Sequence, residues 1–165
     1  MNDLVINVSH ILTNLGEEIK VKGEKDFPPI LTTFRELKFT RPVMYEIKVR
    51  NVGNGLLVDG TFVAKIGLPC SRCLDHFSYT SQTSFEELFR LDGDNNFKVV
   101  NGMINVGPLA EQTIVMNMPV KTLCREDCRG LCPHCGANLN QEKGEHKHDQ
   151  IPSRFSQLKD LLKGK

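Results

Sequence analysis

Hydrophobic and polar residues alternate along several segments of the chain, which is the pattern of half-buried β-strands. The alternation over residues 4–8 and 19–21 predicts two short strands near the N-terminus. Stronger alternation over residues 43–66 predicts two longer strands with Asn54-Gly55 between them. Asn-Gly is a strong hairpin signal, because both central residues of a type I′ turn need positive φ. We therefore expect an antiparallel hairpin here.

Further along, the same period of two continues over residues 77–85, directly after Cys73. The two cysteines at 70 and 73 should therefore lie in a turn between two strands. A small second hairpin is predicted over residues 97–106, around an Asn-Gly dipeptide. The segment 23–42 holds three prolines and is interpreted as an irregular connection.

A helix of about three turns is predicted near residues 108–118, because Pro108 suits a first helical turn and Pro119 ends the run. A short amphipathic helix is expected to follow Pro152. The predicted class is α+β: a β-rich antiparallel body with a few short helices and a C-terminal cysteine-rich zinc-binding module. The body should span residues 1–120, and the module should span residues 121–165 and pack on the body.

Composition and charge narrow the functional classes. The 165 residues are 39% hydrophobic and 25% charged, as in globular proteins. No apolar stretch is long enough to span a bilayer, and no signal peptide is visible, so a cytoplasmic protein without membrane partners is expected. The net charge of +1 argues against gross attraction to nucleic acid but allows a local basic patch.

The cysteines provide the main candidate chemistry. All six fall in two clusters, and without an export signal metal ligation or redox chemistry is favoured over structural disulfides. Two ligands separated by two residues can wrap one zinc ion at a tight turn. The candidate ligands are Cys70, Cys73, Cys124, Cys128, Cys132, Cys135, His146 and His148.

These ligands can be divided in two ways. The four cysteines between residues 124 and 135 could form a self-contained site. Alternatively, both Cys-x2-Cys pairs could share one ion, which leaves Cys124 and Cys128 with the two histidines for a second. One or two zinc ions are therefore expected. Structural zinc can contribute about 10–16 kcal/mol, enough to order a tail poor in aliphatic residues.

Catalytic signatures are missing from the chain. It has no glycine-rich phosphate loop, no His-Glu-x-x-His and no Gly-x-Ser-x-Gly. Cysteine-rich zinc sites are usually closed, whereas catalytic zinc keeps an open position. We therefore expect a non-enzymatic protein without a small-molecule substrate.

Several motifs together carry a family resemblance. They are Cys70-Ser-Arg-Cys73-Leu74, Phe85-Glu-Glu-x-Phe89, Met118-Pro119 and Cys124-Arg-Glu-Asp-Cys128-Arg-Gly-Leu-Cys132-Pro-His-Cys135-Gly-Ala-Asn-Leu-Asn140. Over about residues 40–165 the chain resembles the YceD family, the large ribosomal RNA subunit accumulation proteins of bacteria and plastids. Where many relatives carry Cys-x-Cys, this chain has His146-Lys-His148, a swap that favours both histidines as ligands.

The resemblance implies a factor in ribosome biogenesis that supports processing or accumulation of large-subunit ribosomal RNA. Its expected partner is a ribosomal RNA precursor or a large-subunit assembly protein. Cations beside the presumed ligands are candidates for RNA contact: Arg72, Lys121, Arg125, Arg129, Lys143, Lys147 and Arg154. The alternatives are a thiol redox or redox-switched chaperone protein that uses Cys70 and Cys73, and a zinc-ribbon module that binds protein or DNA.

Overall fold

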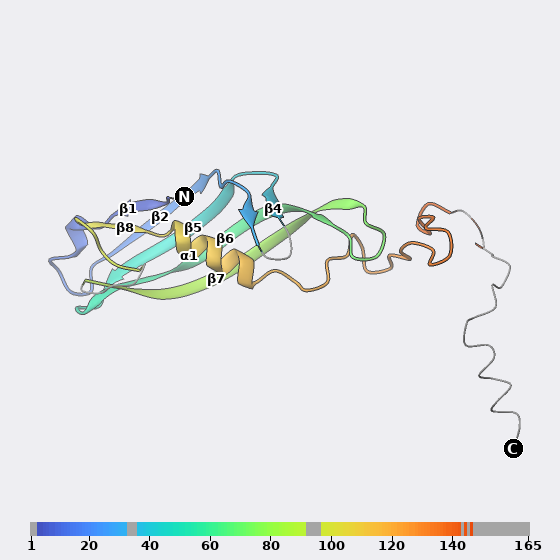
Figure 1. The fold of residues 1–165 in the computed structure, drawn as a ribbon. Coiled ribbons are helices and arrows are strands. Elements are labelled where there is room, and N and C mark those ends of the chain that lie inside the picture. Colours follow the sequence, from blue (N-terminus) through green and yellow to red (C-terminus); the bar gives the residue numbers. More distant parts are fainter. Residues whose placement is uncertain (1–2, 33–35, 92–96, 143, 145, 147–165) are drawn as a thin grey trace, which may run out of the picture.

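The computed structural model describes most of the chain, namely residues 3–32, 36–91, 97–142, 144 and 146. Within these residues β-strands dominate, with one 3-10 helix and one α-helix (Figure 1). In chain order the elements are β1 (Val5–Asn7), the 3-10 helix (Ser9–Ile11), β2 (Glu18–Lys25), β3 (Ile30–Leu31), β4 (Glu36–Phe39), β5 (Val43–Asn51), β6 (Gly55–Pro69), β7 (His76–Arg90), β8 (Met103–Asn105) and α1 (Gly107–Met116). The predicted β-rich antiparallel α+β class is confirmed. The helix expected after Pro152 lies outside the described residues.

The main sheet is built around β6, which is 15 residues long. On one side β6 pairs antiparallel with β7 over its whole length. On the other side it pairs with β5 and, beyond the start of β5, with the short strand β4. Strand β2 extends the sheet beyond β5, while β1 and β8 form a separate two-stranded sheet. The long β6–β7 hairpin therefore projects past its neighbours toward the cysteine-rich end (Figure 1).

The predicted hairpin between β5 and β6 is confirmed, but its turn lies one residue earlier. The register pairs Asn51 with Leu56, and the Val52 N–H donates to the Gly55 carbonyl at 3.0 Å. The central residues are therefore Gly53 and Asn54, and Gly53 alone has positive φ, at 92°. Glycine at the first central position is the requirement of a type II′ turn.

A type I′ geometry is found instead at the second Asn-Gly dipeptide. Asn101 and Gly102 both have positive φ, 50° and 72°, and Val100 pairs with Met103 across them. The predicted hairpin over residues 97–106 nevertheless stops at this one bridge, because β8 pairs with β1 rather than with the preceding residues.

The prediction of an irregular connection over residues 23–42 was wrong in part. Strand β2 continues to Lys25, and the segment then forms β3 and β4. These two strands pair with each other, and β4 pairs with β6 at Lys38 and Phe39. The segment therefore extends the sheet alongside the projecting half of β6.

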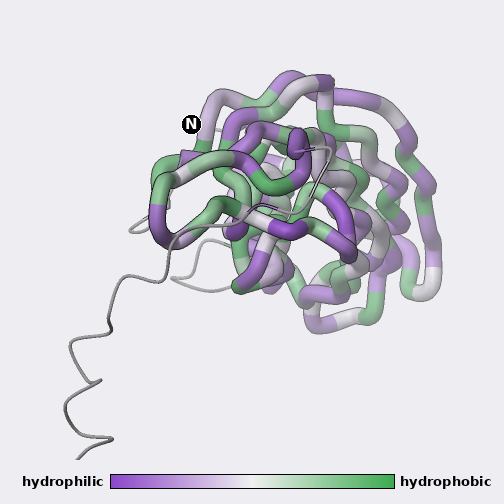
Figure 2. Tube along the Cα trace, turned by 90° about the vertical axis from the view of Figure 1, so that its right-hand side faces the viewer, coloured by the Kyte–Doolittle hydropathy of each residue, from purple (hydrophilic) through white to green (hydrophobic). Residues whose placement is uncertain are grey.

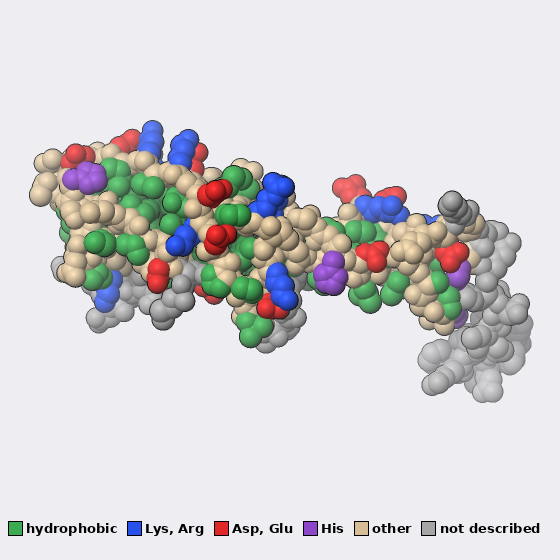
Figure 3. Space-filling view, turned by 90° about the horizontal axis from the view of Figure 1, so that it is seen from above, with side chains coloured by type: hydrophobic (Ala, Val, Ile, Leu, Met, Phe, Trp, Pro, Cys, Tyr) green, Lys and Arg blue, Asp and Glu red, His purple; other side chains and the backbone are tan. Residues whose placement is uncertain are grey.

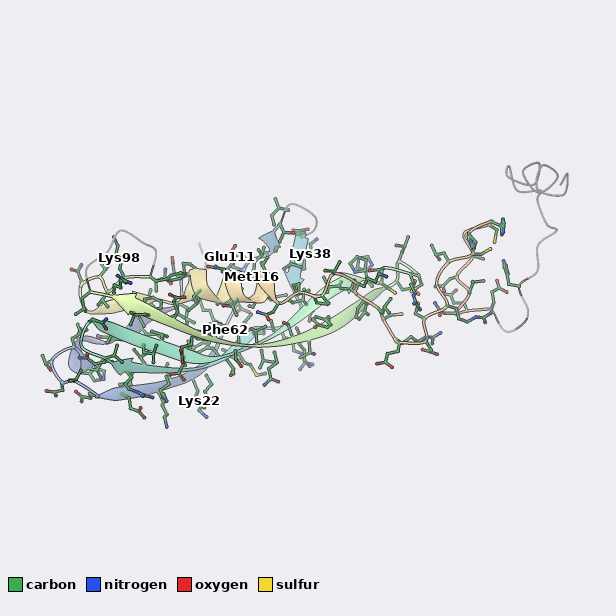
Figure 4. All side chains as sticks on the ribbon, turned by 90° about the horizontal axis from the view of Figure 1, so that it is seen from below. Lys22, Lys38, Phe62, Lys98, Glu111 and Met116 are labelled. Atoms are coloured by element: carbon green, nitrogen blue, oxygen red, sulfur yellow. The ribbon has the colours of Figure 1, made fainter. Side chains whose placement is uncertain are left out.

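Helix α1 covers one face of the sheet. Pro108 lies in its first turn as predicted, and the helix ends at Met116, two residues before the predicted limit. Its buried residues, among them Leu109 and Ile114, join a core with the inward residues of β5, β6 and β7. Within this core the rings of Phe62 and Phe85 stack at 4.6 Å. Figure 4 shows Phe62 on the sheet and Lys22 on the side away from α1.

The other face of the sheet is polar. On β5, buried Ile47 and Val49 alternate with the more exposed Glu46 and Lys48, the alternation expected of a sheet with one solvated face. Figure 2 shows this mixture of hydrophobic and hydrophilic residues along the chain. Within the part of the chain that the structure describes, α1 is too short to cross a bilayer and no other helix could do so.

Candidate metal centre

The turn between β6 and β7 forms the first cysteine knuckle. The Cys70 N–H donates to the Asp75 carbonyl at 2.9 Å, and the Leu74 N–H donates to the Cys70 carbonyl at 3.0 Å. The Arg72 N–H points at the Cys70 sulfur, 3.4 Å away. The predicted position of this cysteine pair, between two strands, is therefore confirmed.

A second knuckle around Cys132 repeats the same hydrogen bonds. The Cys132 N–H donates to the Ala137 carbonyl at 2.8 Å, the Gly136 N–H donates to the Cys132 carbonyl at 2.9 Å, and the His134 N–H points at the Cys132 sulfur at 3.4 Å. Gly136 has φ of 74°. The corresponding residue of the first knuckle, Leu74, takes the same left-handed conformation, with φ of 63°. The two turns are thus equivalent, although one lacks glycine.

Residues after α1 return to the first knuckle through Thr122. The Ser71 N–H donates to the Thr122 carbonyl at 2.7 Å, and the Thr122 hydroxyl donates to the Pro69 carbonyl at 2.9 Å. Thr122 is buried although it lies outside the regular elements. These bonds bring the segment that contains Cys124 and Cys128 alongside the hairpin tip.

Four cysteine sulfurs converge at this tip. The Sγ atoms of Cys70 and Cys128 are 3.7 Å apart, and those of Cys73 and Cys124 are also 3.7 Å apart. The ligand atoms of all four lie within 4.8 Å of one another. Tetrahedral coordination with metal–sulfur bonds of about 2.3 Å places sulfurs about 3.8 Å apart. The cluster therefore has the dimensions of a four-thiolate metal site.

A second group lies further along the chain. Cys132, Cys135 and His146 bring their ligand atoms within 4.8 Å of one another, and the Cys135 sulfur is 3.2 Å from His146 Nε2. The other ring nitrogen, Nδ1, lies 3.8 Å from a Glu142 carboxylate oxygen. A carboxylate at this position is the usual means of orienting a histidine ligand. His148, the predicted fourth ligand, lies outside the described residues.

This grouping differs from both partitions considered from the sequence. The four C-terminal cysteines do not form a self-contained site, and the two Cys-x2-Cys knuckles do not share one ion. Instead the sulfurs of the first knuckle lie together with those of Cys124 and Cys128, and the sulfurs of the second lie together with His146. The reason is the Thr122 contact, a long-range interaction that ligand spacing does not encode.

The thiols of the first group differ in acidity. Burial raises the pKa of Cys70, but hydrogen bonds from the backbone N–H groups of Cys73, Cys124 and Arg72 outweigh it and lower that pKa to about 6. Burial raises the pKa of Cys73 to about 12, and it also raises the pKa of Cys124. In the metal-free fold, one thiolate is therefore stabilised while two neighbours hold their protons.

The second group has an acidic thiol of its own. Burial raises the pKa of Cys132, but hydrogen bonds from the backbone N–H groups of Cys135 and His134 outweigh it and lower that pKa. Backbone N–H groups directed at sulfur are a common feature of cysteine-rich metal sites, where they stabilise the thiolate ligand.

Two asparagines that the sequence did not indicate join the segment after the second knuckle to the first group and the hairpin tip. Asn140 Nδ2 lies 3.4 Å from the Cys128 sulfur, and Asn140 Oδ1 accepts from the Arg129 N–H at 2.8 Å. Asn138 Nδ2 donates to an Asp75 carboxylate oxygen at 2.8 Å, across to the hairpin tip. The only signal for these roles is their place just after the last cysteine, which is weak because asparagine is common in loops.

The candidate RNA-contacting cations fall into three groups. Arg72 donates to the Cys128 carbonyl at 2.8 Å and so joins the hairpin tip to the module, whereas Arg125 pairs with Asp127 and donates to Asn140 within the module. Lys121 and Arg129 are exposed. Figure 3 shows basic and acidic side chains mixed over one face of this end. The remaining three candidates, Lys143, Lys147 and Arg154, lie outside the described residues.

The donor sets fit a metal of the zinc type. Soft thiolate and imidazole donors at tetrahedral spacing suit zinc or iron, whereas magnesium and calcium prefer oxygen. None of the six cysteines forms a disulfide. Fold and site together define a β-sheet protein with, at one end, two cysteine-rich groups whose donor atoms are spaced to hold metal ions.

Comparison with known families places the chain within this class. Residues 58–162 match the family model described as "Large ribosomal RNA subunit accumulation protein YceD". The match covers more than half of the chain, from β6 through both cysteine groups. The chain therefore belongs to the YceD family, and the predicted resemblance is confirmed.

Curated relatives come from mycobacteria. Proteins of Mycobacterium bovis and Mycobacterium tuberculosis, both described as uncharacterized, are 32% identical over 126 residues, or 71% of this chain and 60% of theirs. An uncharacterized protein of Mycobacterium leprae is 30% identical over 135 residues, or 76% of this chain and 62% of its own. The chain thus spans about three fifths of the length of these relatives. No solved structure matches it significantly.

Proposed function

We propose that the chain is a non-enzymatic factor in the accumulation of large-subunit ribosomal RNA, and that its metal module contacts a ribosomal RNA precursor. The observation that carries the proposal is that the family match spans both cysteine groups and the hairpin tip that joins them. A role in ribosome assembly would place the protein in the cytoplasm.

Zinc is the proposed metal. Four thiolates form a closed tetrahedral set, which is typical of structural zinc and leaves no open position for a reacting water. For the second group, the sequence supplies His148 as the proposed fourth ligand. In both groups the metal would fix the backbone rather than perform chemistry, which supports a binding role over catalysis.

Lys121 and Arg129 are the best candidates for phosphate contact among the described cations. Both are exposed, and within the described part of the chain neither side chain has an ion-pair partner. Each lies within three residues of a cysteine of the first group, on backbone that the metal would hold in place. A cation on a rigid loop loses less conformational entropy when it binds than one on a flexible loop.

A contact of this kind should depend on salt and on these two side chains. In the metal-loaded chain, Lys121→Ala with Arg129→Ala should weaken binding to a precursor RNA fragment and make it less salt-sensitive, because each lost phosphate contact lowers the salt slope by about one. Lys98→Ala is the matched control, because Lys98 is exposed and lies at the far end of the body (Figure 4).

Ultraviolet crosslinking in growing cells, followed by sequencing of the attached RNA, tests the proposal directly. Enrichment at a defined site of the large-subunit precursor, lost in the double variant and kept in the Lys98→Ala control, is the expected result. RNA at background level would contradict RNA contact, and co-purification with a large-subunit assembly protein would then favour the protein partner.

Thiol redox chemistry is the alternative with an observation of its own, the lowered pKa of Cys70. The surrounding geometry favours metal binding instead, because two further cysteines bring all four sulfurs within 4.8 Å of one another. Thiol–disulfide exchange that survives zinc loading and is lost in Cys70→Ser would support the redox function.

A further inference from the structure

The outer edge of β7 is unpaired in the described structure. The pairing of β6 with β7 runs without a bulge from Gly55 opposite Arg90 to Pro69 opposite His76. At Arg90 both backbone groups point away from β6, since its N–H donates to Phe97 and its carbonyl accepts from Val99. By alternation, the even-numbered residues of β7 direct their N–H and C=O groups outward. From His76 to Leu88 no described residue pairs with them.

This edge lacks the features that normally prevent strand addition. Residues 77–85 contain no charge, proline or glycine, and read Phe-Ser-Tyr-Thr-Ser-Gln-Thr-Ser-Phe. The opposite edge strand, β2, has charges at five of its eight residues. Natural sheets protect free edges with charged residues, proline or bulges. One edge of this sheet is therefore protected, and the other is suited to pairing with a further strand.

The sequence of the edge is partly symmetric about Ser81, because two of the four flanking residue pairs are identical and the other two, Tyr79 with Thr83 and Thr80 with Gln82, are not. Phe77 and Phe85 are equidistant from it, as are Ser78 and Ser84. We propose that the occupant of this edge is a second copy of the chain, whose β7 pairs antiparallel with the first about a two-fold axis at Ser81. An isologous contact of this kind requires a self-complementary segment, and the outward backbone groups on both sides of Ser81, with matching Phe and Ser pairs, provide one.

This register brings complementary groups together. Each outward N–H and C=O from His76 to Glu86 meets a partner on the other copy, and His76 of one copy lies opposite Glu86 of the other. On the inner face, Phe77 of one copy lies opposite Phe85 of the other, and both rings are only half-buried in the single chain. Aromatic cross-strand pairs contribute roughly 0.2–1 kcal/mol each. The two metal modules lie at opposite ends of the joined sheet.

The first test is the mass of the metal-loaded chain in solution by sedimentation equilibrium, at concentrations up to about 100 µM. The expected mass is twice the 18.6 kDa of one chain. Gln82→Pro should raise the dissociation constant at least tenfold. It removes an outward N–H and leaves the bonds to β6 intact, as proline on an edge strand allows. Circular dichroism checks that the variant keeps its strands.

The second test fixes the register. Ser81 faces itself as a non-hydrogen-bonded pair, in which Cα atoms lie about 4.5 Å apart, within the range that a disulfide spans. Ser81→Cys should therefore form a reducible dimer with oxidised glutathione, located by peptide mapping. Thr83→Cys is the matched control: it is buried on the same face, but the two copies of residue 83 would lie about 14 Å apart.

The two tests together either support the proposed dimer or overturn it. A dimer that Gln82→Pro dissociates, and that Ser81→Cys crosslinks while Thr83→Cys does not, supports the proposal. A monomer at every concentration, a dimer unaffected by Gln82→Pro, or equal crosslinking of the two cysteine variants would overturn it.

Discussion

One side chain, Asn140, holds several parts of the metal module. Its amide nitrogen faces the Cys128 sulfur, and its oxygen accepts from the Arg129 N–H and from the Arg125 guanidinium. Groups that hydrogen-bond to a metal ligand fix its orientation, and their loss typically costs 10- to 100-fold in metal affinity. The four-thiol group should therefore depend on this residue.

We predict that Asn140→Ala lowers zinc affinity of the four-thiol group by about 10- to 100-fold. Competition with a chromophoric chelator measures the change. Asn14→Ala is the control, because Asn14 also makes a side-chain hydrogen bond but lies on the body, bonded to Glu17. Equal affinities for both variants would show that Asn140 does not support the site.

The thiol pKa values predict that metal binding releases protons. At pH 7.5 Cys70, with a pKa of about 6, is already a thiolate, whereas Cys73, with a pKa of about 12, and Cys124, whose pKa is also raised, must each lose a proton to bind. Below pH 6 Cys70 is protonated too, so affinity should fall more steeply there than at neutral pH.

Calorimetric titration of the metal-free chain with zinc, in buffers of different ionisation enthalpy, measures this release. The observed heat should change with the buffer at pH 7.5, and the number of protons released should increase as the pH falls through 6. A heat independent of the buffer would contradict the acidities derived from the fold.

At the scale of residues, the sequence indicated which cysteines lie in knuckles better than it indicated how they are grouped. Cysteine spacing identifies each knuckle, because a Cys-x2-Cys turn is a local structure. The pairing of knuckles with other ligands depends on Thr122 and Ser71, which lie 51 positions apart and meet only in the fold. Asn140 was missed for the same reason, since nothing local shows that it reaches Cys128.

Among the elements, β6 determines the geometry of the main sheet, because it pairs with strands on both sides. Two of its glycines provide a matched pair. A Cβ on Gly60 would clash with the Glu46 backbone oxygen of β5, whereas the nearest atom to a Cβ on Gly67 is 3.5 Å away. The first position therefore requires glycine for close strand approach, and the second has room for alanine.

We predict that Gly60→Ala lowers the free energy of unfolding by roughly 2–3 kcal/mol, because the β5 backbone must move to admit the methyl group. Gly67→Ala should change it by less than about 1 kcal/mol. Urea unfolding followed by circular dichroism compares the two. Equal losses of stability in the two variants would show that β5 accommodates a methyl group at position 60 without a cost in free energy.

Elements with a clear period of hydrophobic residues were predicted from the sequence, and short elements without such a period were not. The alternation over residues 43–66 and 77–85 predicted β5, β6 and β7, and Pro108 with Pro119 bracketed α1. Strands β3 and β4 have two and four residues, too few to show alternation among prolines. They form because β6 extends beyond β5 and offers them an edge, which is a tertiary cause.

Across the whole molecule, the body and the module have separate cores. The large apolar core joins the strands and α1, whereas a second, smaller buried cluster consists of Cys70, Cys73 and Cys128. Phe77 packs against both. Since the body buries enough apolar surface of its own, its stability should not depend on metal.

Metal removal should therefore unfold the module and spare the body. After chelation, limited proteolysis should cut within residues 121–142, while the strand signal in circular dichroism persists. Restored zinc should restore protection. Loss of the strand signal on chelation would show instead that the body requires the metal, and unchanged protection would show that the module folds without it.

We propose that the β6–β7 hairpin tip and the segment after α1 share one metal ion, while the second knuckle holds another, because their donor atoms are grouped in this way. Native mass spectrometry of the full chain tests it most directly. We predict two zinc ions, with Cys70→Ser and Cys124→Ser each losing the same one and Cys132→Ser losing the other. A Cys70→Ser variant that keeps both ions would contradict the account, because the C-terminal cysteines would then bind metal without the hairpin.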